Sequence, residues 1–384
     1  MKITNVTPWL IEMPLPYLDA PEQTPRDGEF VFVQVDTDEG ITGWGEFTVS
    51  TPTANRAAAA LLGQIGALIE GEDPTRIELL WHKIFREYSY MGSRGAGSCV
   101  ASAIDIALWD IRGRQLGLPI CDLLGGPVRN TIALYTHPDG SFDPANVAAA
   151  SEAIVTQGFT TIKTGPFPNN CPEGTRAYIS GQIDEAGEEL GVEIIAAMRE
   201  AVGPGVEILI DAHGQFDVPT AIRLANRLEP YNIGWFEEPL PPESNHALHQ
   251  VRERTNVPIC VGERMYTRFD FLPVLEKGLA EYIMPDVTWT GGISELKKIS
   301  TLAETFNIPV SPHDAGGPVN IAAGAHVMAT VPNFFKLEIS RARWDVYDRM
   351  MDQPFEIREG HLHLSKRPGL GFNMNPEFLR EHAK

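Results

Sequence analysis

The chain has 384 residues, 43% of them apolar, and a formal net charge of −20, so it is long enough for two domains with a large core. This charge disfavours nucleic acid and anionic membranes as partners, and it means that an anionic substrate needs local positive charge, such as a metal ion, at its site. Four scattered cysteines, no membrane-length apolar stretch and no signal-like N-terminus lead us to expect a cytoplasmic protein without a disulfide framework.

Residues 1–125 are predicted to form an α+β domain. The N-terminal residues predict a strand, and the alternating stretches Phe30–Val35 and Ile41–Phe47 predict a hairpin. Helices are predicted over about 53–70 and 98–116 from apolar residues at helical spacing. Glycines and a proline then mark a domain boundary near residue 125.

After residue 126 the pattern changes to strands that alternate with helices. Strands are predicted at 132–135, 160–163, 207–210, 234–237, 258–262, 282–285, 309–311 and 334–337. Eight such repeats favour a closed parallel barrel over residues 126–345. The alternative is an open doubly wound sheet, but no glycine-rich phosphate motif follows the first strand. The turn-rich tail, residues 346–384, is expected to pack on the N-terminal domain.

Polar side chains follow six successive predicted strands, 23 to 27 residues apart: Asp211, Glu237, Glu263, Asp286, His313 and Glu338. The carboxyl ends of barrel strands converge on one mouth, so these side chains are expected to meet there. Each acid taken alone could be a helix N-cap or a surface charge. Three carboxylates in register, Asp211, Glu237 and Glu263, instead predict a cation among them, and oxygen ligands alone suit Mg²⁺.

Three basic side chains are expected beside these acids. Asp286 would orient the His313 imidazole and raise its basicity, which suits a general base. If the strand continues past Asp211, then His213 shares its face and points toward the metal pocket; otherwise it is a loop histidine. Lys163 ends the second strand, where it would be either buried among the acids or solvated.

These residues resemble the enolase superfamily, in particular its mandelate racemase-like subgroup. The resemblance covers the whole chain and includes the motifs Gly43-Trp44-Gly45-Glu46, Ala103-Ile104-Asp105-Ile106-Ala107-Leu108-Trp109-Asp110, Glu237-Glu238-Pro239, Gly262-Glu263-Arg264, Pro285-Asp286 and Gly291-Gly292. It implies a modified TIM barrel, (β/α)7β, an N-terminal capping domain completed by the C-terminal tail, and homo-oligomers such as dimers or octamers.

The resemblance also implies roles for individual residues. Mg²⁺ would be bound by Asp211, Glu237 and Glu263. His313 with Asp286 would be the base on one face of the substrate, and Glu338 would hydrogen-bond the enolate oxygen. The candidates for substrate contact are Lys163, His213, the Leu15–Arg26 loop and Tyr88, Tyr90 and Arg94 in the 88–97 loop.

One departure from the family pattern bears on the reaction. Many members carry Lys-x-Lys on the second strand, but here Gly165 stands at the third position, which disfavours two-base racemisation. His213 instead matches the acid of galactonate- and gluconate-dehydratase-like members. We therefore expect a Mg²⁺-dependent dehydratase that converts a sugar acid, an aldonate, into a 2-keto-3-deoxy acid through proton abstraction at C2.

Three other functions stay open at this point. A racemase or epimerase could use Lys163 as its second base. A lactone cycloisomerase would share the proton-abstraction half-reaction. A protein that binds a sugar acid without turning it over is the third alternative, although intact ligand and base positions argue against it.

Overall fold

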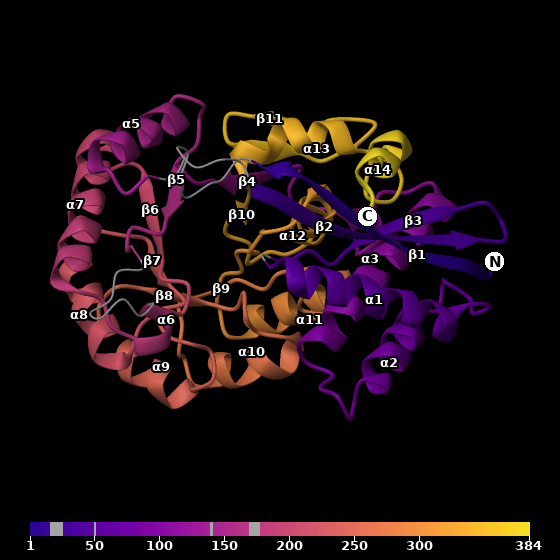
Figure 1. Ribbon diagram of the computed structural model, residues 1–384, viewed down its shortest axis with the longest axis horizontal. Helices are drawn as coiled ribbons and strands as arrows, with labels where there is room; N and C mark the ends of the chain where they lie inside the picture. The colour runs from indigo at the N-terminus through magenta and orange to yellow at the C-terminus, as the bar shows by residue number, and fades with distance from the viewer. Residues whose placement is uncertain (16–25, 50, 139–140, 169–176) are drawn as a thin grey trace.

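The structure of the chain, a computed structural model, describes residues 1–384 except 16–25, 50, 139–140 and 169–176. An antiparallel sheet with three helices lies beside a ring of short parallel strands surrounded by helices (Figure 1). No helix in these described ranges is long and apolar enough to cross a membrane.

The N-terminal sheet has the order β1-β2-β3, formed by β1 (Ile3–Leu15), β2 (Arg26–Thr37) and β3 (Thr42–Glu46). Alternate residues of β2 enter two different cores. Phe30 and Phe32 pack into the large core of the barrel, whereas Val31, Val33 and Val35 pack against the N-terminal helices. Because successive side chains of a strand point to opposite faces, β2 joins the two parts of the molecule.

Three helices cover this sheet: α1 (Pro52–Ile69), α2 (Ile77–Glu87) and α3 (Ala96–Leu116). The helix α3 is buried over most of its circumference and lies directly against β3. A Cβ atom at Gly43 or Gly45 would stand 2.2 or 1.8 Å from a carbonyl oxygen of α3. The Gly-Trp-Gly-Glu motif therefore has glycines where the strand and helix backbones touch.

The barrel strands are β4 (Thr131–Tyr135), β5 (Thr161–Thr164), β6 (Glu207–Asp211), β7 (Trp235–Glu237), β8 (Ile259–Val261), β9 (Tyr282–Ile283) and β10 (Leu337–Glu338). The strands β5 to β9 pair in parallel in chain order, and β10 pairs in parallel with β4. Parallel bridges Thr136–Ile162, Ile283–Val310 and Val310–Phe334 close the ring. At 309–311, where a strand is predicted, the structure thus has only isolated bridges at Val310, one to Ile283 and one to Phe334.

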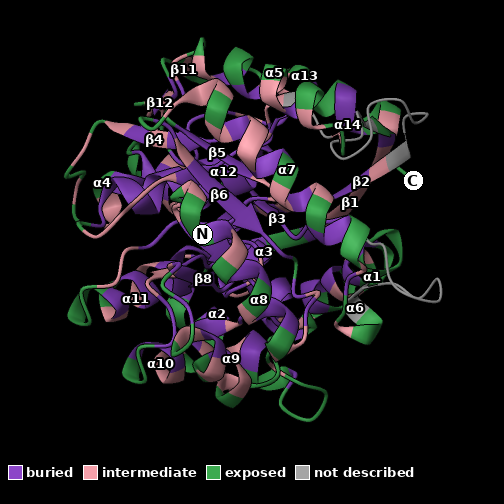
Figure 2. Cartoon of the chain, turned by 90° about the vertical axis from the view of Figure 1, so that its left-hand side faces the viewer, coloured by how far each residue is buried: buried purple, intermediate pink, exposed green. Residues whose placement is uncertain are grey.

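The barrel helices are α5 (Pro144–Val155), α7 (Glu185–Val202), α8 (Val218–Leu228), α9 (Asn245–Arg252), α10 (Thr267–Glu276), α11 (Gly292–Thr305) and α12 (Pro318–Ala329), with the short turns α4 (Ile120–Leu123) and α6 (Ala177–Ser180). Side chains of Asp143, Asp184, Asp217 and Ser244 cap four of them. Figure 2 shows that the strands inside the ring are buried and that exposed residues lie on the outer helix faces. Every residue of α12 is buried, because it lies between the barrel and the N-terminal sheet.

The C-terminal segment contains α13 (Trp344–Met350), β11 (Glu356–Arg358), β12 (His361–His363) and α14 (Pro376–His382). It contacts both parts of the molecule: β12 pairs with the barrel strand β4, and Ala383 forms a bridge with Ile11 of β1. The division into residues 1–125, 126–345 and 346–384 stays a prediction, and its last boundary falls within α13.

Candidate active site

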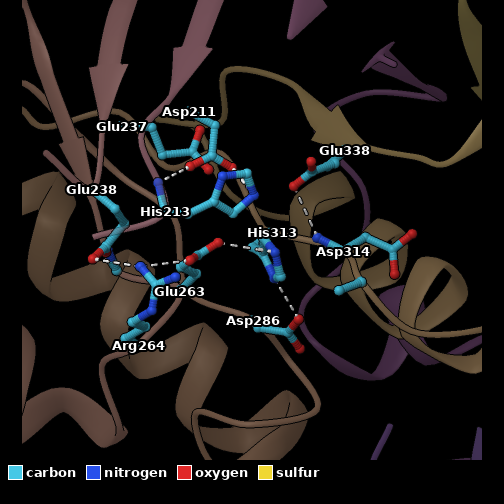
Figure 3. Close-up of polar contacts among 12 residues, drawn as sticks. Asp211, His213, Glu237, Glu238, Glu263, Arg264, Asp286, His313, Asp314 and Glu338 are labelled. Atoms are coloured by element: carbon cyan, nitrogen blue, oxygen red, sulfur yellow. Dashed lines mark hydrogen bonds and ion pairs between the residues drawn. The ribbon is translucent and has the colours of Figure 1, made fainter. Parts of the chain in front are cut away.

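Three carboxylates meet at the mouth of the barrel. Asp211 and Glu237 are paired residues at the ends of β6 and β7, and Glu263 follows β8 by two residues. Each offers one oxygen, and these oxygens all lie within 4.8 Å of one another among buried residues (Figure 3). Among the described residues this is the one group of acids, histidines and cysteines placed to hold a metal ion.

The charge of this cluster calls for a cation. Burial first, and the neighbouring Asp211 next, raise the pKa of Glu237 well above its usual range. Such a shift means that the ionised cluster is costly without positive charge between its members. A donor set of carboxylate oxygens alone fits a hard divalent ion such as Mg²⁺.

Lys163 supplies part of that positive charge. Its Nζ lies 2.7 Å from Glu237, 2.7 Å from Glu338 and 3.4 Å from Asp211, and its side chain is only 1% exposed. Burial alone would lower the pKa of Lys163, but Glu237 and Glu338 hold it well above the usual range. Lys163 is therefore a buried ammonium among the acids, and the solvated alternative does not apply.

His313 lies against the metal candidates and is held by Asp286. Its Nδ1 is 2.8 Å from Asp286 Oδ2, and its Nε2 is 3.1 Å from Glu263 Oε2 (Figure 3). The indole of Trp289 lies 5.0 Å from the imidazole, ring centre to ring centre. Burial would lower the pKa of His313, but Glu263 and Asp286 raise it to about 9.

His213 reaches the same cluster by a route that the sequence does not predict. The strand β6 ends at Asp211, and His213 adopts a left-handed backbone with φ +52°, so strand alternation does not continue to it. Its backbone N–H donates to Asp211 Oδ1 at 2.8 Å, and its Nε2 lies 3.3 Å from Asp211 Oδ2. The side chain is 54% exposed, so the imidazole is open to a substrate.

Gly165 explains how this imidazole fits. A Cβ atom at Gly165 would lie 3.3 Å from His213 Cε1 and 3.4 Å from the Asp211 carbonyl oxygen. The His213 ring thus lies over the second-strand position at which many family members carry their second lysine. A side chain at Gly165 would therefore require the His213 ring to shift by a few tenths of an ångström.

Glu338 is the centre of a second polar group at the mouth. It accepts from Tyr135 Oη at 3.2 Å and from the backbone N–H of Asp314 at 3.2 Å, and its Oε1 is 2.7 Å from His137 Nε2. Burial opposes ionisation, but Lys163 and His137 hold the pKa of Glu338 well below its usual range. His137 is not among the residues predicted from the sequence, although it follows the first strand just as the predicted acids follow theirs.

Glu238 and Arg264 lie next to the three clustered carboxylates. Arg264 lies 2.9 Å from Glu263 Oε1 and 3.4 Å from Glu238 Oε2, and Glu238 accepts from the backbone N–H of Gly262 (Figure 3). Burial and the neighbouring Glu263 raise the pKa of Glu238 to about 7. The motifs that surround Glu237 and Glu263 therefore form one charged network next to the cluster.

The predicted substrate contacts of the N-terminal domain are not joined to this site by any described interaction. Tyr88 is buried, whereas the Tyr90 side chain is fully exposed. Arg94 forms an ion pair with Asp270 on α10. Residues 16–25 of the Leu15–Arg26 loop lie outside the described residues. Substrate binding by these residues stays a prediction.

Two protein families match the chain. Residues 12–125 match the mandelate racemase / muconate lactonizing enzyme N-terminal domain, and residues 145–378 match the enolase C-terminal domain-like family. The chain therefore belongs to the mandelate racemase / muconate lactonizing enzyme group of the enolase superfamily, a capping domain on a TIM-barrel-like domain.

Individual relatives match over nearly the full length. The chain is 34% identical to a D-galactonate dehydratase of Pectobacterium atrosepticum, covering 100% of this chain and 95% of that protein. It is 31% identical to a D-gluconate dehydratase of Thermoproteus tenax, covering 92% of this chain and 69% of that one. A crystal structure of a mandelate racemase/muconate lactonizing enzyme-like protein from Rubrobacter xylanophilus superposes with a TM-score of 0.88 at 35% identity, covering 100% and 97% of the two chains.

Proposed function

We propose that this chain, a hydro-lyase of the sugar-acid dehydratase group, uses Mg²⁺ and two histidines to remove water from an aldonic acid and release a 2-keto-3-deoxy acid. The observation that carries the proposal is the pair of imidazoles at one carboxylate cluster: His313, held by the buried Asp286, and His213, lying over Gly165. One group can take a proton while the other gives one, as an elimination requires.

Asp211, Glu237 and Glu263 would hold the metal ion. When bound there, Mg²⁺ would act as a Lewis acid that stabilises negative charge developing on the substrate's carboxylate oxygens. Its charge would also offset the long-range repulsion between an acid substrate and a chain of net charge −20.

His313 would remove the proton from C2. Its Nδ1 is occupied by Asp286, which fixes the ring and leaves Nε2 to face the cluster. In the neutral ring, an Nδ1–H that donates to Asp286 makes Nε2 the proton acceptor. The buried Asp286 then stabilises the imidazolium that forms.

His213, in its protonated form, would donate a proton to the leaving 3-hydroxyl. Its half-exposed ring lies beside Asp211, with Nε2 3.3 Å from Asp211 Oδ2. Glu338, held by Lys163 and His137, would accept a hydrogen bond from the hydroxyl of the enol. Loss of the C2 proton and of the 3-hydroxyl as water gives an enol, which tautomerises to the keto acid.

The contacts of Lys163 argue against a racemase or epimerase. A second base must lose its proton before it can act, but three carboxylates surround this ammonium and stabilise its charge. A lactone cycloisomerase releases no keto acid, and a protein that only binds sugar acids turns none over. The product of the reaction therefore separates all of these functions.

The direct test is a set of aldonic and aldaric acids with Mg²⁺, scored for keto-acid formation, followed by two substitutions. We expect His313→Asn to lose exchange of the C2 proton in D₂O together with dehydration. His213→Asn should lose dehydration, by about 10²-fold or more, and keep C2 exchange.

His249→Asn, at a surface histidine on α9, is the matched control and should behave as the unchanged protein. Normal turnover by His313→Asn would refute the assignment of the base. A product racemised at C2 without loss of water would replace the proposed reaction with epimerisation.

A further inference from the structure

The Gly-Trp-Gly-Glu motif ends in a carboxylate that the proposed reaction does not use. Glu46 closes β3 in the N-terminal domain and is fully buried. Its Oε1 accepts from the backbone N–H of Gly317 and from the hydroxyl of Thr48, both at 2.6 Å, and its Oε2 accepts from the backbone N–H of Asn320 at 3.0 Å.

Glu46 therefore caps α12 from another part of the chain. Gly317 is the residue before α12 and has no side chain to cap it, while Asn320 is the third residue of the helix. The first N–H groups of a helix need acceptors, and its N-terminus favours a negative charge. A Cβ atom at Gly316 or Gly317 would stand 2.9 or 3.0 Å from Glu46 Oε1, so both glycines leave room for this carboxylate.

The first turn of α12 connects Glu46 to the proposed catalytic base, His313. The side chain of Asn320, whose backbone binds Glu46, donates through Nδ2 to Asp286 Oδ1 and Oδ2 at 3.3 and 3.2 Å. Asp286 Oδ1 also accepts from the N–H and hydroxyl of Thr288, and its Oδ2 lies 2.8 Å from His313 Nδ1. Glu46, Asn320 and Asp286 are all buried, so water does not compete for these bonds.

A second contact from the same segment holds the indole that lies beside the imidazole. Trp289, whose ring lies beside His313, donates its Nε1–H to the carbonyl oxygen of Thr48 at 2.7 Å. Residues Glu46 and Thr48 thus reach His313 by two routes, through α12 and through Trp289.

We propose that Glu46 is a positioning residue for the catalytic base, and that it fixes the His313–Asp286 pair through the N-terminus of α12 and Asn320. This inference rests on the proposed role of His313. It assigns the capping domain a part in orienting the base, in addition to covering the barrel. For comparison, replacing a group that orients a metal-ligating side chain typically changes metal affinity or activity by 10- to 100-fold.

The first test is Glu46→Gln. The amide keeps the size of the side chain but turns one acceptor into a donor, so either Gly317 or Asn320 loses its partner. Burial raises the pKa of Glu46 to about 7, so measurements at pH 8 start from the carboxylate. We expect C2-proton exchange in D₂O to fall on the order of 10-fold, with KM and Mg²⁺ affinity unchanged.

Asp110→Asn is the matched control. Asp110 is another buried carboxylate of the same domain, which accepts from the backbone N–H groups of Trp44 and Leu370 and has no described contact with α12 or His313. It should lower thermal stability without lowering the exchange rate of the folded protein. Unchanged exchange in Glu46→Gln, or an equal loss in Asp110→Asn, would overturn the proposal.

Asn320→Ala keeps the backbone N–H that binds Glu46 and removes only the side-chain amide that binds Asp286. If Glu46→Gln does not fold, the exchange rate of Asn320→Ala tests the proposal instead. The two changes act on one route, so the double variant should exchange no more slowly than the slower single variant. Strictly additive losses would refute the route through Asn320.

A spectroscopic measurement separates this proposal from the proposed function. The Nδ1–H of His313, bonded to a buried carboxylate, should give a low-field proton NMR signal that is absent in His313→Gln. Glu46→Gln and Asn320→Ala should shift this signal, and Asp110→Asn should not. If the wild-type chain exchanged no C2 proton of any sugar acid, the proposed function would fail, and this signal would still decide the positioning role.

Discussion

Gly165 and His213 show how one missing side chain shapes the site. The glycine is needed here for space, since its φ lies outside the left-handed region and its Cβ position is close to the His213 ring. The ring in turn depends on the left-handed backbone of His213 and on its bonds to Asp211. The sequence reveals only that the second lysine is absent. The structure shows that the His213 ring lies next to Gly165, where that lysine would begin.

Gly165→Ala tests this arrangement by adding a single methyl group beside the His213 ring. The added methyl group would lie 3.3 Å from His213 Cε1, so the ring must move by a few tenths of an ångström. We expect the kcat of dehydration to fall about 10-fold while C2 exchange by His313 is kept. Gly63→Ala on α1, where the nearest atom is Pro8 Cγ at 3.9 Å, is the control. Equal loss of exchange and dehydration would contradict a selective effect on His213.

At the scale of elements, carboxylates of the N-terminal domain cap barrel helices. Glu46 caps α12, and Asp105 of α3 accepts from the backbone N–H and the hydroxyl of Ser294 in the first turn of α11. Ser102 of α3 accepts the N–H of Gly291, just before that helix. The sequence motifs that contain Glu46 and Asp105 thus join the two domains.

Asp105→Asn should change how stability depends on pH. Burial raises the pKa of Asp105 from 3.8 to about 7, against opposing hydrogen bonds from Ser294. The folded chain therefore holds this proton more tightly than the unfolded chain, and stability is lost as pH rises through this range. Asn can keep both bonds to Ser294 without a charge.

The free energy of unfolding of Asp105→Asn should accordingly rise relative to wild type between about pH 4 and pH 7, by at most about 4 kcal/mol. Urea unfolding at several pH values measures this difference. A difference that stays constant with pH would show that Asp105 is ionised in the folded chain throughout this range.

At the scale of the whole molecule, negative charge dominates. The formal net charge is −20, and the three clustered acids and Glu338 share the mouth with the buried Lys163. A bound cation should therefore stabilise the folded chain as well as serve the reaction. Residence in the cytoplasm and assembly into dimers or octamers stay predictions, and sedimentation would test the second.

Mg²⁺ at about 100 times its dissociation constant should stabilise the chain by roughly 2.7 kcal/mol and raise the melting temperature, and EDTA should reverse the effect. Glu263→Gln should weaken this response, because it removes one of the three charges. Glu189→Gln, at a surface acid paired with Arg227, should retain it. If Glu263→Gln showed the same rise in melting temperature at the same Mg²⁺ concentration as the unchanged chain, the ion would bind elsewhere.

Much of this was predictable from local sequence. The strand–helix alternation fixed the barrel and the order of the strand-end residues, because apolar β-strands bounded by polar turns show clearly in sequence. The strand predicted at 309–311 is reduced to one residue, since only Val310 forms bridges there, to Ile283 and to Phe334. His137 was not predicted, because its partner Glu338 lies 201 residues later in the chain.

The sequence by itself determined the barrel, the N-terminal α+β domain and the three acids of the carboxylate cluster, because these depend on local periodicity and on the rule that strand ends share one mouth. Only the tertiary structure decided which groups face one another: the burial of Lys163, the His213 ring above Gly165, and the route from Glu46 to His313. Those contacts join residues up to 274 positions apart, and their geometry depends on backbone turns and packing that no local pattern specifies.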